Sequence, residues 1–511
     1  MLEKVYGGAV FGVSSTTITI EVNVAKGAGY HLVGLPDSAI KESSYRISAA
    51  LKNNSYKMPR KKITINMAPA DLRKEGSAYD LGIAIGILAA SSQISVDNLS
   101  EYAIMGELSL DGSLQPIKGS LPIAIKAREE GFKGFIVPIQ NVKEAGVVNN
   151  LNVYGVENIK QAIDHLEGKE LIKPEVINTR EFFYESLNNF DFDFSEVKGQ
   201  ENIKRCLEIA AAGGHNVIMV GPPGSGKTML AKRIPSILPP MSLQEALETT
   251  KIHSVAGKNT QNGLMTTRPF RSPHHTISDV ALVGGGSYPQ PGEISLSHNG
   301  VLFLDELPEF KKNVLEVMRQ PLEDREVTIS RARFTVTYPA SFMLVASMNP
   351  SPSGYFNDPD KALVSSPFEM QRYLSKISGP LLDRIDIHIE VTPVPFDKLS
   401  EERKGESSKV IRERVIKARE RQVKRFIENN NVHYNAQMGP KQISLYCKLS
   451  KEGKELIKTA MDKLGLSARA YDRILKVSKT ISDLEGKDSI ENHHIAEAIQ
   501  YRSLDREGWL G

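Results

Sequence analysis

Residues 216–228 read NVIMVGPPGSGKT, and this stretch decides the fold of the region around it. Four apolar residues at 217–220 predict a short buried strand, and the next eight match G-x-x-x-x-G-K-T without a gap. A glycine-rich turn of this kind points its backbone N–H groups inward, and the helix that follows adds its positive end, so a polyphosphate can be bound there. The alternative is an ordinary glycine turn between a strand and a helix. The predicted phosphate-binding residues are Gly221, Pro222, Pro223, Gly224, Ser225, Gly226, Lys227 and Thr228.

A second apolar strand ends in two carboxylates, in the sequence GVLFLDE at residues 300–306. We expect Lys227 to lie beside the β and γ phosphates and the Thr228 hydroxyl to coordinate Mg²⁺. Asp305 is expected to reach the same Mg²⁺ through water, and Glu306 to polarise the attacking water. A surface acid pair after a core strand is the alternative. The two motifs together predict an ATPase whose cofactors are ATP and Mg²⁺.

Composition sets limits on the class of protein. The chain has 511 residues, 40% of them hydrophobic, and 64 Lys and Arg balance 61 Asp and Glu to a net charge of +3. This length predicts several domains, and the small charge means that any nucleic-acid contact must come from local clusters. Two cysteines, Cys206 and Cys447, exclude a disulfide framework, and the longest apolar run is about half a membrane span. We therefore expect a cytoplasmic protein with no membrane contact.

The first 170 residues alternate strand and helix patterns. Period-two alternation at 16–24 and 62–67 predicts half-buried strands, and helical patterns cover 37–51, 78–90 and 121–130. We interpret this region as a mixed α/β domain.

Two segments of this domain resemble the Lon-protease-like domain: MAPADLRKEGSAYDLGIAIGIL and GELSLDGSLQPIKGSLPIAIKAREEGF. Matched without gaps, the resemblance places Ala78 at the nucleophilic serine and Leu121 at the lysine base, with Ser77 and Lys118 close by. A serine without a nearby base is only a hydroxyl. We therefore predict a catalytically empty domain used in assembly or substrate contact, and protease activity is not expected.

The rest of the chain divides by pattern. Periodicity lapses at 171–192, which predicts a linker. We expect an α/β P-loop core with a parallel sheet at 193–395, and a helical lid domain at 396–511. Between the P-loop and the acid strand, RSPHHTISDVALVGGGSYPQPGE at 271–293 predicts loops and a functional insertion. Its two adjacent histidines lack the companions of a metal site.

Five further polar positions follow the acid strand. VTISRARFTVTY at 327–338 predicts a hairpin with Arg331 and Arg333 at its tip, which we interpret as DNA contacts. The alternative is that they pair with Glu323, Asp324 or Glu326 and hold the hairpin in shape. Asn349 ends an apolar strand where AAA+ proteins have sensor 1. Arg384 resembles a finger that reaches the nucleotide of a neighbouring subunit, and Arg469 resembles sensor 2 of the lid; a salt-bridged surface arginine is the alternative for Arg384.

A basic amphipathic helix is predicted at 403–425, a segment that contains ten Lys and Arg but only three Glu. It would serve either as a solvated face or as a surface for nucleic acid.

FRSPHHTISDVALVGGGSYPQPGEISLSHNGVLFLDELPEF, then ASMNP and ISGPLLDRIDIHIEV, resemble the YifB/ComM family of magnesium-chelatase-like AAA+ ATPases over nearly the whole chain. The resemblance implies a homo-hexameric ring, two insertions facing its pore, and ATP-driven branch migration or helicase activity on single-stranded or branched DNA in natural transformation or recombination. Many relatives bind zinc after sensor 1. Here no zinc is expected, because serine and leucine stand near the ligand positions: Ser351, Ser353, Leu363 and Ser365.

Two functions therefore remain open. The first is a DNA motor. The second is a protein-remodelling or magnesium-chelatase-type chaperone ATPase, for which a protein partner, not DNA, should stimulate ATP turnover.

Overall fold

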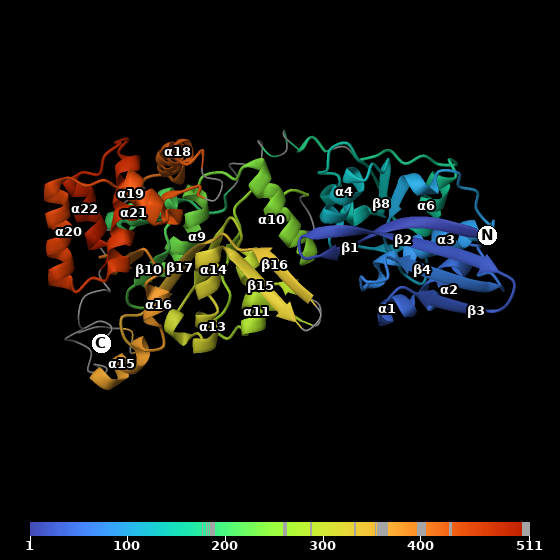
Figure 1. The fold of residues 1–511 in the computed structure, drawn as a ribbon, viewed down its shortest axis with the longest axis horizontal. Helices are drawn as coiled ribbons and strands as arrows, with labels where there is room; N and C mark the ends of the chain where they lie inside the picture. Colours follow the sequence, from blue (N-terminus) through green and yellow to red (C-terminus); the bar gives the residue numbers. More distant parts are fainter. Residues whose placement is uncertain are drawn as a thin grey trace. The chain divides into compact units, whose positions relative to one another are not determined.

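The computed structural model describes residues 1–175, 177–179, 181, 183, 190–258, 263–286, 289–331, 334–352, 354, 366–395, 405–428 and 432–502. The chain divides into two compact units (Figure 1). Unit 1 comprises Met1–Leu187, Ser242–Thr266 and Pro289–Pro291, and unit 2 comprises Asn188–Met241, Thr267–Tyr288 and Gly292–Gly511. The described residues include no helix long and apolar enough to cross a membrane.

Unit 1 is built on a mixed sheet of seven described strands in the order β3-β4-β2-β1-β5-β8-β9. The predicted alternation is confirmed: Ile18, Ile20 and Val22 of β2 are buried, and the residues between them are partly exposed. The strands are β1 (Leu2–Phe11), β2 (Ser14–Ala25), β3 (Gly29–Val33), β4 (Lys62–Ala68), β5 (Tyr102–Ile104), β8 (Gly134–Pro138) and β9 (Asn152–Val156), with a small hairpin of β6 (Glu107–Leu108) and β7 (Leu114–Gln115).

Helix α3 (Asp80–Ala90) packs against β1 and β2 of this sheet. All of its residues are buried. Gly86 makes this possible, because a Cβ there would lie 2.7 Å from a Val22 methyl carbon on β2. The predicted helix at 37–51 is instead two helices that meet at Glu42. The other helices are α1 (Ser38–Lys41), α2 (Ser43–Asn53), α4 (Ser120–Glu129), α5 (Val142–Ala145) and α6 (Ile159–Leu166).

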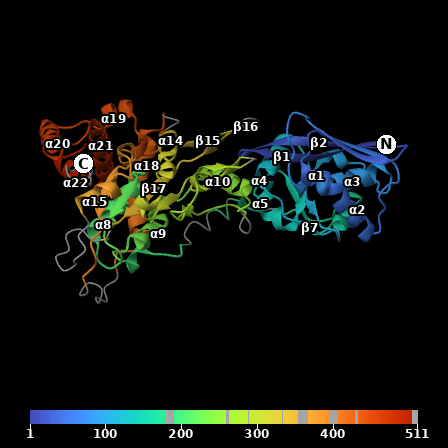
Figure 2. The ribbon, with the colours of Figure 1, turned by 90° about the horizontal axis from the view of Figure 1, so that it is seen from below.

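One helix of unit 1 comes from the segment between the P-loop and the acid strand. Helix α10 (Leu243–Val255) begins with a capping box at Ser242 and lies against α4, as Figures 1 and 2 show. The Ser254 hydroxyl donates to the buried Glu144 carboxylate, and Gly119 N donates to Ser254 O at 3.1 Å. The stretch 193–395, expected as a core with insertions, therefore contributes one helix to unit 1, because this helix buries its apolar side there.

Unit 2 contains a parallel five-stranded sheet in the order β11-β14-β17-β10-β18. Strands β10 (Val217–Val220), β14 (Val301–Leu304) and β17 (Met343–Met348) are buried along their whole length, as expected for strands covered on both faces. The edge strands are β11 (Phe270–Arg271) and β18 (Ile387–Glu390). Strand β17 separates the P-loop strand from the acid strand.

One set of helices surrounds this sheet, and a second set forms the lid. The lid helices α19 to α22 lie together in Figure 2. The lid packs on the core because α18 and α21 both lie against α8. The core helices are α8 (Glu201–Gly213), α9 (Lys227–Ile237), α11 (Asp279–Val283), α12 (Glu293–Leu296), α13 (Lys312–Glu316), α14 (Arg319–Asp324), α15 (Pro367–Leu374) and α16 (Gly379–Leu382). The lid helices are α18 (Ser408–Arg425), α19 (Pro440–Tyr446), α20 (Lys451–Leu464), α21 (Ala468–Leu484) and α22 (Asn492–Gln500).

The predicted arginine-tipped hairpin is confirmed as a backbone element. Strands β15 (Glu326–Arg331) and β16 (Phe334–Pro339) pair in antiparallel register, with Arg331 opposite Phe334. Arg333 and the Arg331 side chain lie outside the described part of the chain, as do three of the four expected zinc-position residues, Ser353, Leu363 and Ser365.

Candidate nucleotide site

The carboxyl ends of β10, β14 and β17 meet at one edge of the unit 2 sheet, and the P-loop turn lies there. Gly221 N donates to Met348 O at 3.1 Å, which ties the turn to β17. A Cβ on Gly221 would lie 2.2 Å from Val391 O, so only glycine allows this close approach. Gly224 and Gly226 have φ values of 78° and 91°, in the left-handed region.

Lys227 points into the P-loop turn. Its Nζ donates to Gly221 O at 2.6 Å, to Pro222 O at 3.0 Å and to Asn349 Oδ1 at 3.3 Å. Burial lowers the pKa of Lys227, while Asp305 and Glu306 nearby favour its charged form. The predicted P-loop lysine and sensor 1 asparagine are thus brought together by adjacent parallel strands.

The Thr228 hydroxyl donates to Asp305 Oδ2 at 2.7 Å. On its other side, Asp305 accepts a hydrogen bond from the Ser347 hydroxyl. Ser347 was not predicted as a site residue. Its role depends on strand register: β14 and β17 pair Leu304 with Ala346, so the next residue of each strand is Asp305 beside Ser347. The Thr228 hydroxyl and the Asp305 carboxylate, two possible oxygen ligands of a metal ion, therefore lie together at the expected Mg²⁺ position.

Glu306 has an unusual backbone conformation, with φ of 55°. Its N–H donates to Asp305 Oδ1 at 3.1 Å and to Ser347 Oγ at 3.3 Å, which fixes the turn after β14. The Glu306 side chain is 53% exposed, and one of its oxygens lies 3.8 Å from His275 Nδ1. The insertion histidine is therefore a neighbour of the expected catalytic carboxylate.

Gln200 also lies beside the P-loop, although it was not among the predicted site residues. It has a left-handed backbone with φ of 57°, and its side-chain amide donates to Ser225 O at 2.9 Å and to Thr392 O at 3.1 Å. The amide joins the P-loop to the segment after β18. The positive φ, which an ordinary side chain rarely adopts, had no clear signal in the sequence.

The two predicted arginines do not contact the P-loop of their own subunit within the described residues. The Arg384 side chain is 11% exposed and forms an ion pair with Glu323. Arg469 is 66% exposed and donates to Asp383 Oδ2 at 2.7 Å. Since Asp383 and Arg384 are adjacent in the chain, both arginines belong to one region of unit 2.

The basic helix α18 uses most of its arginines for internal contacts. Its buried residues Ile411, Val415 and Ala418 confirm the predicted apolar face. Four arginines bind acids or carbonyls of the same unit: Arg414 binds Glu208 and Glu406, Arg419 binds Ala211 O, Arg421 binds Asp488, and Arg425 binds Asp483. These four are occupied, which weakens the interpretation of the helix as a nucleic-acid surface.

In unit 1, the positions matched to the protease dyad are filled differently. Leu121 is fully buried, and its N–H donates to Glu144 Oε1 at 3.1 Å. The Ser77 hydroxyl donates to the Glu107 carboxylate, and the Lys118 stem lies against Gly257. No described contact joins Ser77 to a lysine.

The described residues also hold one group of three potential metal ligands, in the lid: Glu485, His493 and His494. Glu491 N donates to His494 Nδ1 at 2.9 Å, so the neutral ring carries its proton on Nε2 and donates to Glu485. This nitrogen therefore has no lone pair for a metal.

The buried parallel sheet, the strand between the P-loop and acid strands, and the helical lid define an AAA+-type P-loop protein. Three protein-family models match segments of this chain. They are described as "Magnesium chelatase, subunit ChlI" (residues 193–399), "Subunit ChlI of Mg-chelatase" (20–141) and "Magnesium chelatase, subunit ChlI C-terminal" (405–502).

Similar proteins extend over the whole chain. It is 45% identical over 511 residues to Competence protein ComM of Haemophilus influenzae, covering 99% of this chain and 98% of that protein. It is 44% identical over 510 residues to the YifB protein of Escherichia coli, covering 99% and 98%. Lon protease 2 of Bacillus subtilis is 26% identical over 180 residues, 32% of each chain. The chain belongs to the YifB/ComM family of magnesium-chelatase-like AAA+ proteins.

Proposed function

We propose that this protein hydrolyses ATP with Mg²⁺ and uses the energy to move DNA. The observation that carries the ATPase part is the convergence of two contacts at one sheet edge, Lys227 with Asn349 and Thr228 with Asp305. In this proposal Lys227 neutralises the β and γ phosphates, and Asn349 positions the γ phosphate or the attacking water.

The donor set fits a magnesium ion, because hydroxyl and carboxylate oxygens are the hard ligands that Mg²⁺ prefers. Thr228 and Asp305 would hold the ion, which supplies charge neutralisation to the transferred phosphoryl group. Ser347 fixes the orientation of Asp305 through its hydroxyl. The direct hydrogen bond between Thr228 and Asp305 would give way to these two residues holding the ion.

Glu306 acts on water. Its N–H group donates two hydrogen bonds that hold the turn after β14, and its half-exposed carboxylate lies 3.8 Å from His275 Nδ1. A carboxylate in this position accepts the proton of the attacking water. Arg384 acts on a nucleotide of the neighbouring subunit in a homo-hexameric ring, and Arg469 reads the nucleotide from the helical lid.

The DNA part of the proposal rests on the relative named Competence protein ComM and on the hairpin of β15 and β16. Arg331 and Arg333 at its turn supply cations for phosphate contacts in branch migration. The alternative is a protein-remodelling or magnesium-chelatase-type chaperone ATPase, which the chelatase family matches favour.

ATP turnover with different effectors separates the two functions. We expect single-stranded or branched DNA to raise turnover regardless of base sequence, with an effect that falls steeply as salt rises. A Lys227→Ala variant gives the background rate. Turnover that is unchanged by any DNA structure, with assembled rings, would contradict the DNA function and favour a protein partner.

A further inference from the structure

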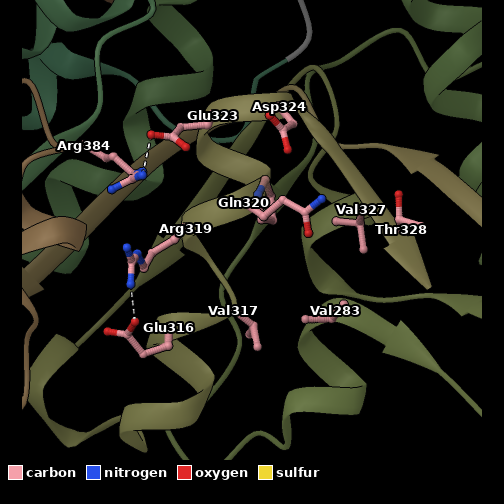
Figure 3. Close-up of a pocket in the computed structure, with 11 residues that line it drawn as sticks. Val283, Glu316, Val317, Arg319, Gln320, Glu323, Asp324, Val327, Thr328 and Arg384 are labelled. Carbon is pink, nitrogen blue, oxygen red and sulfur yellow. Dashed lines mark hydrogen bonds and ion pairs between the residues drawn. The ribbon is translucent and has the colours of Figure 1, made fainter. Parts of the chain in front are cut away.

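The Arg384 side chain is held inside its own subunit. Its Nη2 group pairs with Glu323 on α14 (Figure 3). Its Nη1 group donates to Pro380 O. Its carbonyl oxygen accepts a hydrogen bond from the Asn216 amide at 3.0 Å, so the backbone is fixed as well. The Arg384 Nε group is buried and has no hydrogen-bond partner in the described part of the chain. The guanidinium is therefore held, but not fully satisfied.

A cavity of about 510 Å³ opens beside this ion pair. Figure 3 shows a second ion pair along its wall, in which Arg319 Nη1 donates to Glu316 at 2.8 Å. Arg384 and Glu323 both line this cavity, so the ion pair borders open space. The Glu323 side chain is 59% exposed, and an ion pair with so exposed a carboxylate is weak.

Glu323 also lies at the base of the arginine-tipped hairpin. Helix α14 ends at Asp324, and Arg325, with φ of 59°, turns the chain directly into β15. Arg325 N donates to Pro321 O at 3.0 Å, and Ala340 N donates to Arg325 O at 2.7 Å, which closes the two ends of the hairpin on this residue. A movement of α14 is therefore transmitted to the hairpin through hydrogen-bonded backbone.

We propose that Glu323 is a positioning residue for Arg384, whose carboxylate occupies the place of a phosphate and is displaced when a second copy of this chain presents bound ATP. Guanidinium groups bind carboxylate and phosphate oxygens through the same N–H groups, so one exchanges for the other. The triphosphate carries more negative charge than the single exposed Glu323 carboxylate, so it binds the Arg384 guanidinium more strongly. Release of Glu323 frees α14 and shifts the hairpin. This inference rests on the proposed trans action of Arg384.

The test is ATP turnover of the full chain with Glu323→Gln. Loss of the negative charge should free Arg384 more often and raise turnover without DNA several-fold, with an unchanged KM for ATP. The rise should appear only at concentrations where rings form. Glu316→Gln is the matched control, because it removes the other ion pair of the same cavity. Turnover of Glu323→Gln equal to or below that of Glu316→Gln, with normal rings, would overturn the inference.

Two further variants separate this inference from the proposed function. Arg384→Ala should be nearly inactive, and Glu323→Gln combined with Arg384→Ala should be equally inactive. If Arg384→Ala retains wild-type turnover, the trans role itself fails, and the positioning role fails with it. If Arg384→Ala is inactive but Glu323→Gln behaves as wild type, only the positioning role is overturned.

The link to the hairpin has its own readout. In Glu323→Gln, DNA should stimulate turnover by a smaller factor than in the wild type, because the released state exists without DNA. A raised basal rate with an unchanged stimulation factor would overturn the hairpin link.

Discussion

The nucleotide site of unit 2 and the protease-like region of unit 1 differ in how they hold polar groups. In unit 2, Lys227 binds carbonyl oxygens of its own turn, and the Glu306 side chain is 53% exposed. In unit 1, Leu121 is fully buried and Glu144 is 6% exposed, and Glu144 Oε1 accepts hydrogen bonds from Leu121 N and the Ser254 hydroxyl. Partners that a ligand can replace indicate a site kept for binding. Groups satisfied by buried partners indicate a site converted to packing.

The largest expected effect tests the unit 2 side of this comparison. Glu306→Gln should reduce ATP turnover by about 10² to 10⁴, because general base catalysis contributes that range. Binding of Mg²⁺-ATP should remain, since Lys227, Thr228 and Asp305 are unchanged. Steady-state turnover and binding of a fluorescent ATP analogue measure the two quantities. Glu309→Gln is the control, an exposed carboxylate paired with Lys376. Near-normal hydrolysis in Glu306→Gln would remove Glu306 from catalysis.

Leu121→Lys tests the unit 1 side. A lysine at this fully buried position should lower the free energy of unfolding by about 4 kcal/mol, the equivalent of a three-unit pKa shift. Thermal or urea unfolding of the full chain measures the loss. Leu110→Lys, at a position 59% exposed, is the control and should have little effect. Peptide cleavage by Leu121→Lys combined with Ala78→Ser would contradict the view that this region has been converted to packing.

The sequence predicts well which residues gather at this sheet edge, because the P-loop spacing depends on local geometry. Gly221 to Thr228, Asp305 and Asn349 come together as parallel strands require. Ser347 could be found only from the register of β17 beside β14, which pairs residues far apart in the chain.

Long-range contacts limit what patterns reveal about the fold. The membership of α10 in unit 1 depends on Ser254 and Glu144, which lie 110 residues apart. Periodicity within α10 predicts a helix with a buried face but not the partner of that face. The ion pair between Arg384 and Glu323 is equally invisible, because nothing in either segment identifies the other.

A smaller effect is expected in unit 1, where the buried Glu144 should make the stability of the fold depend on pH. Burial raises the pKa of Glu144, although hydrogen bonds from Ser254 and Leu121 oppose it. The folded state therefore retains the proton to higher pH than the unfolded chain does, and Glu144's contribution to stability falls as pH rises above the ordinary value of 4.5.

Glu144→Gln should remove this decline, so its melting temperature should change less with pH than that of the wild type. Glu157→Gln, at an exposed glutamate of unit 1, is the control and should keep the wild-type slope. A Glu144→Gln curve parallel to the wild type would contradict a raised pKa at this position.

The smallest expected effect concerns the hairpin arginines of unit 2. Changing Arg331 and Arg333 to Ala should weaken DNA binding similarly for all sequences and reduce the slope of log affinity against log salt by up to about two units. ATP binding should be unchanged. Filter binding at several salt concentrations, with a melting curve, measures both. An unchanged slope of log affinity against log salt, with intact rings, would contradict the proposed DNA contact.

The place of α10 has a consequence for dissecting the protein with proteases. The chain passes from unit 2 to unit 1 at Ser242 and returns at Thr267, in addition to the first crossing between Leu187 and Asn188. A single cut at that first crossing therefore yields two fragments on a denaturing gel, yet the N-terminal fragment keeps its hold on α10, which remains covalently part of the other piece. The fragments should co-elute from a gel-filtration column under native conditions. Deleting residues 1–187 would uncover the apolar side of α10, including the buried Ala246 and Ile252, so the remaining chain would be prone to aggregate.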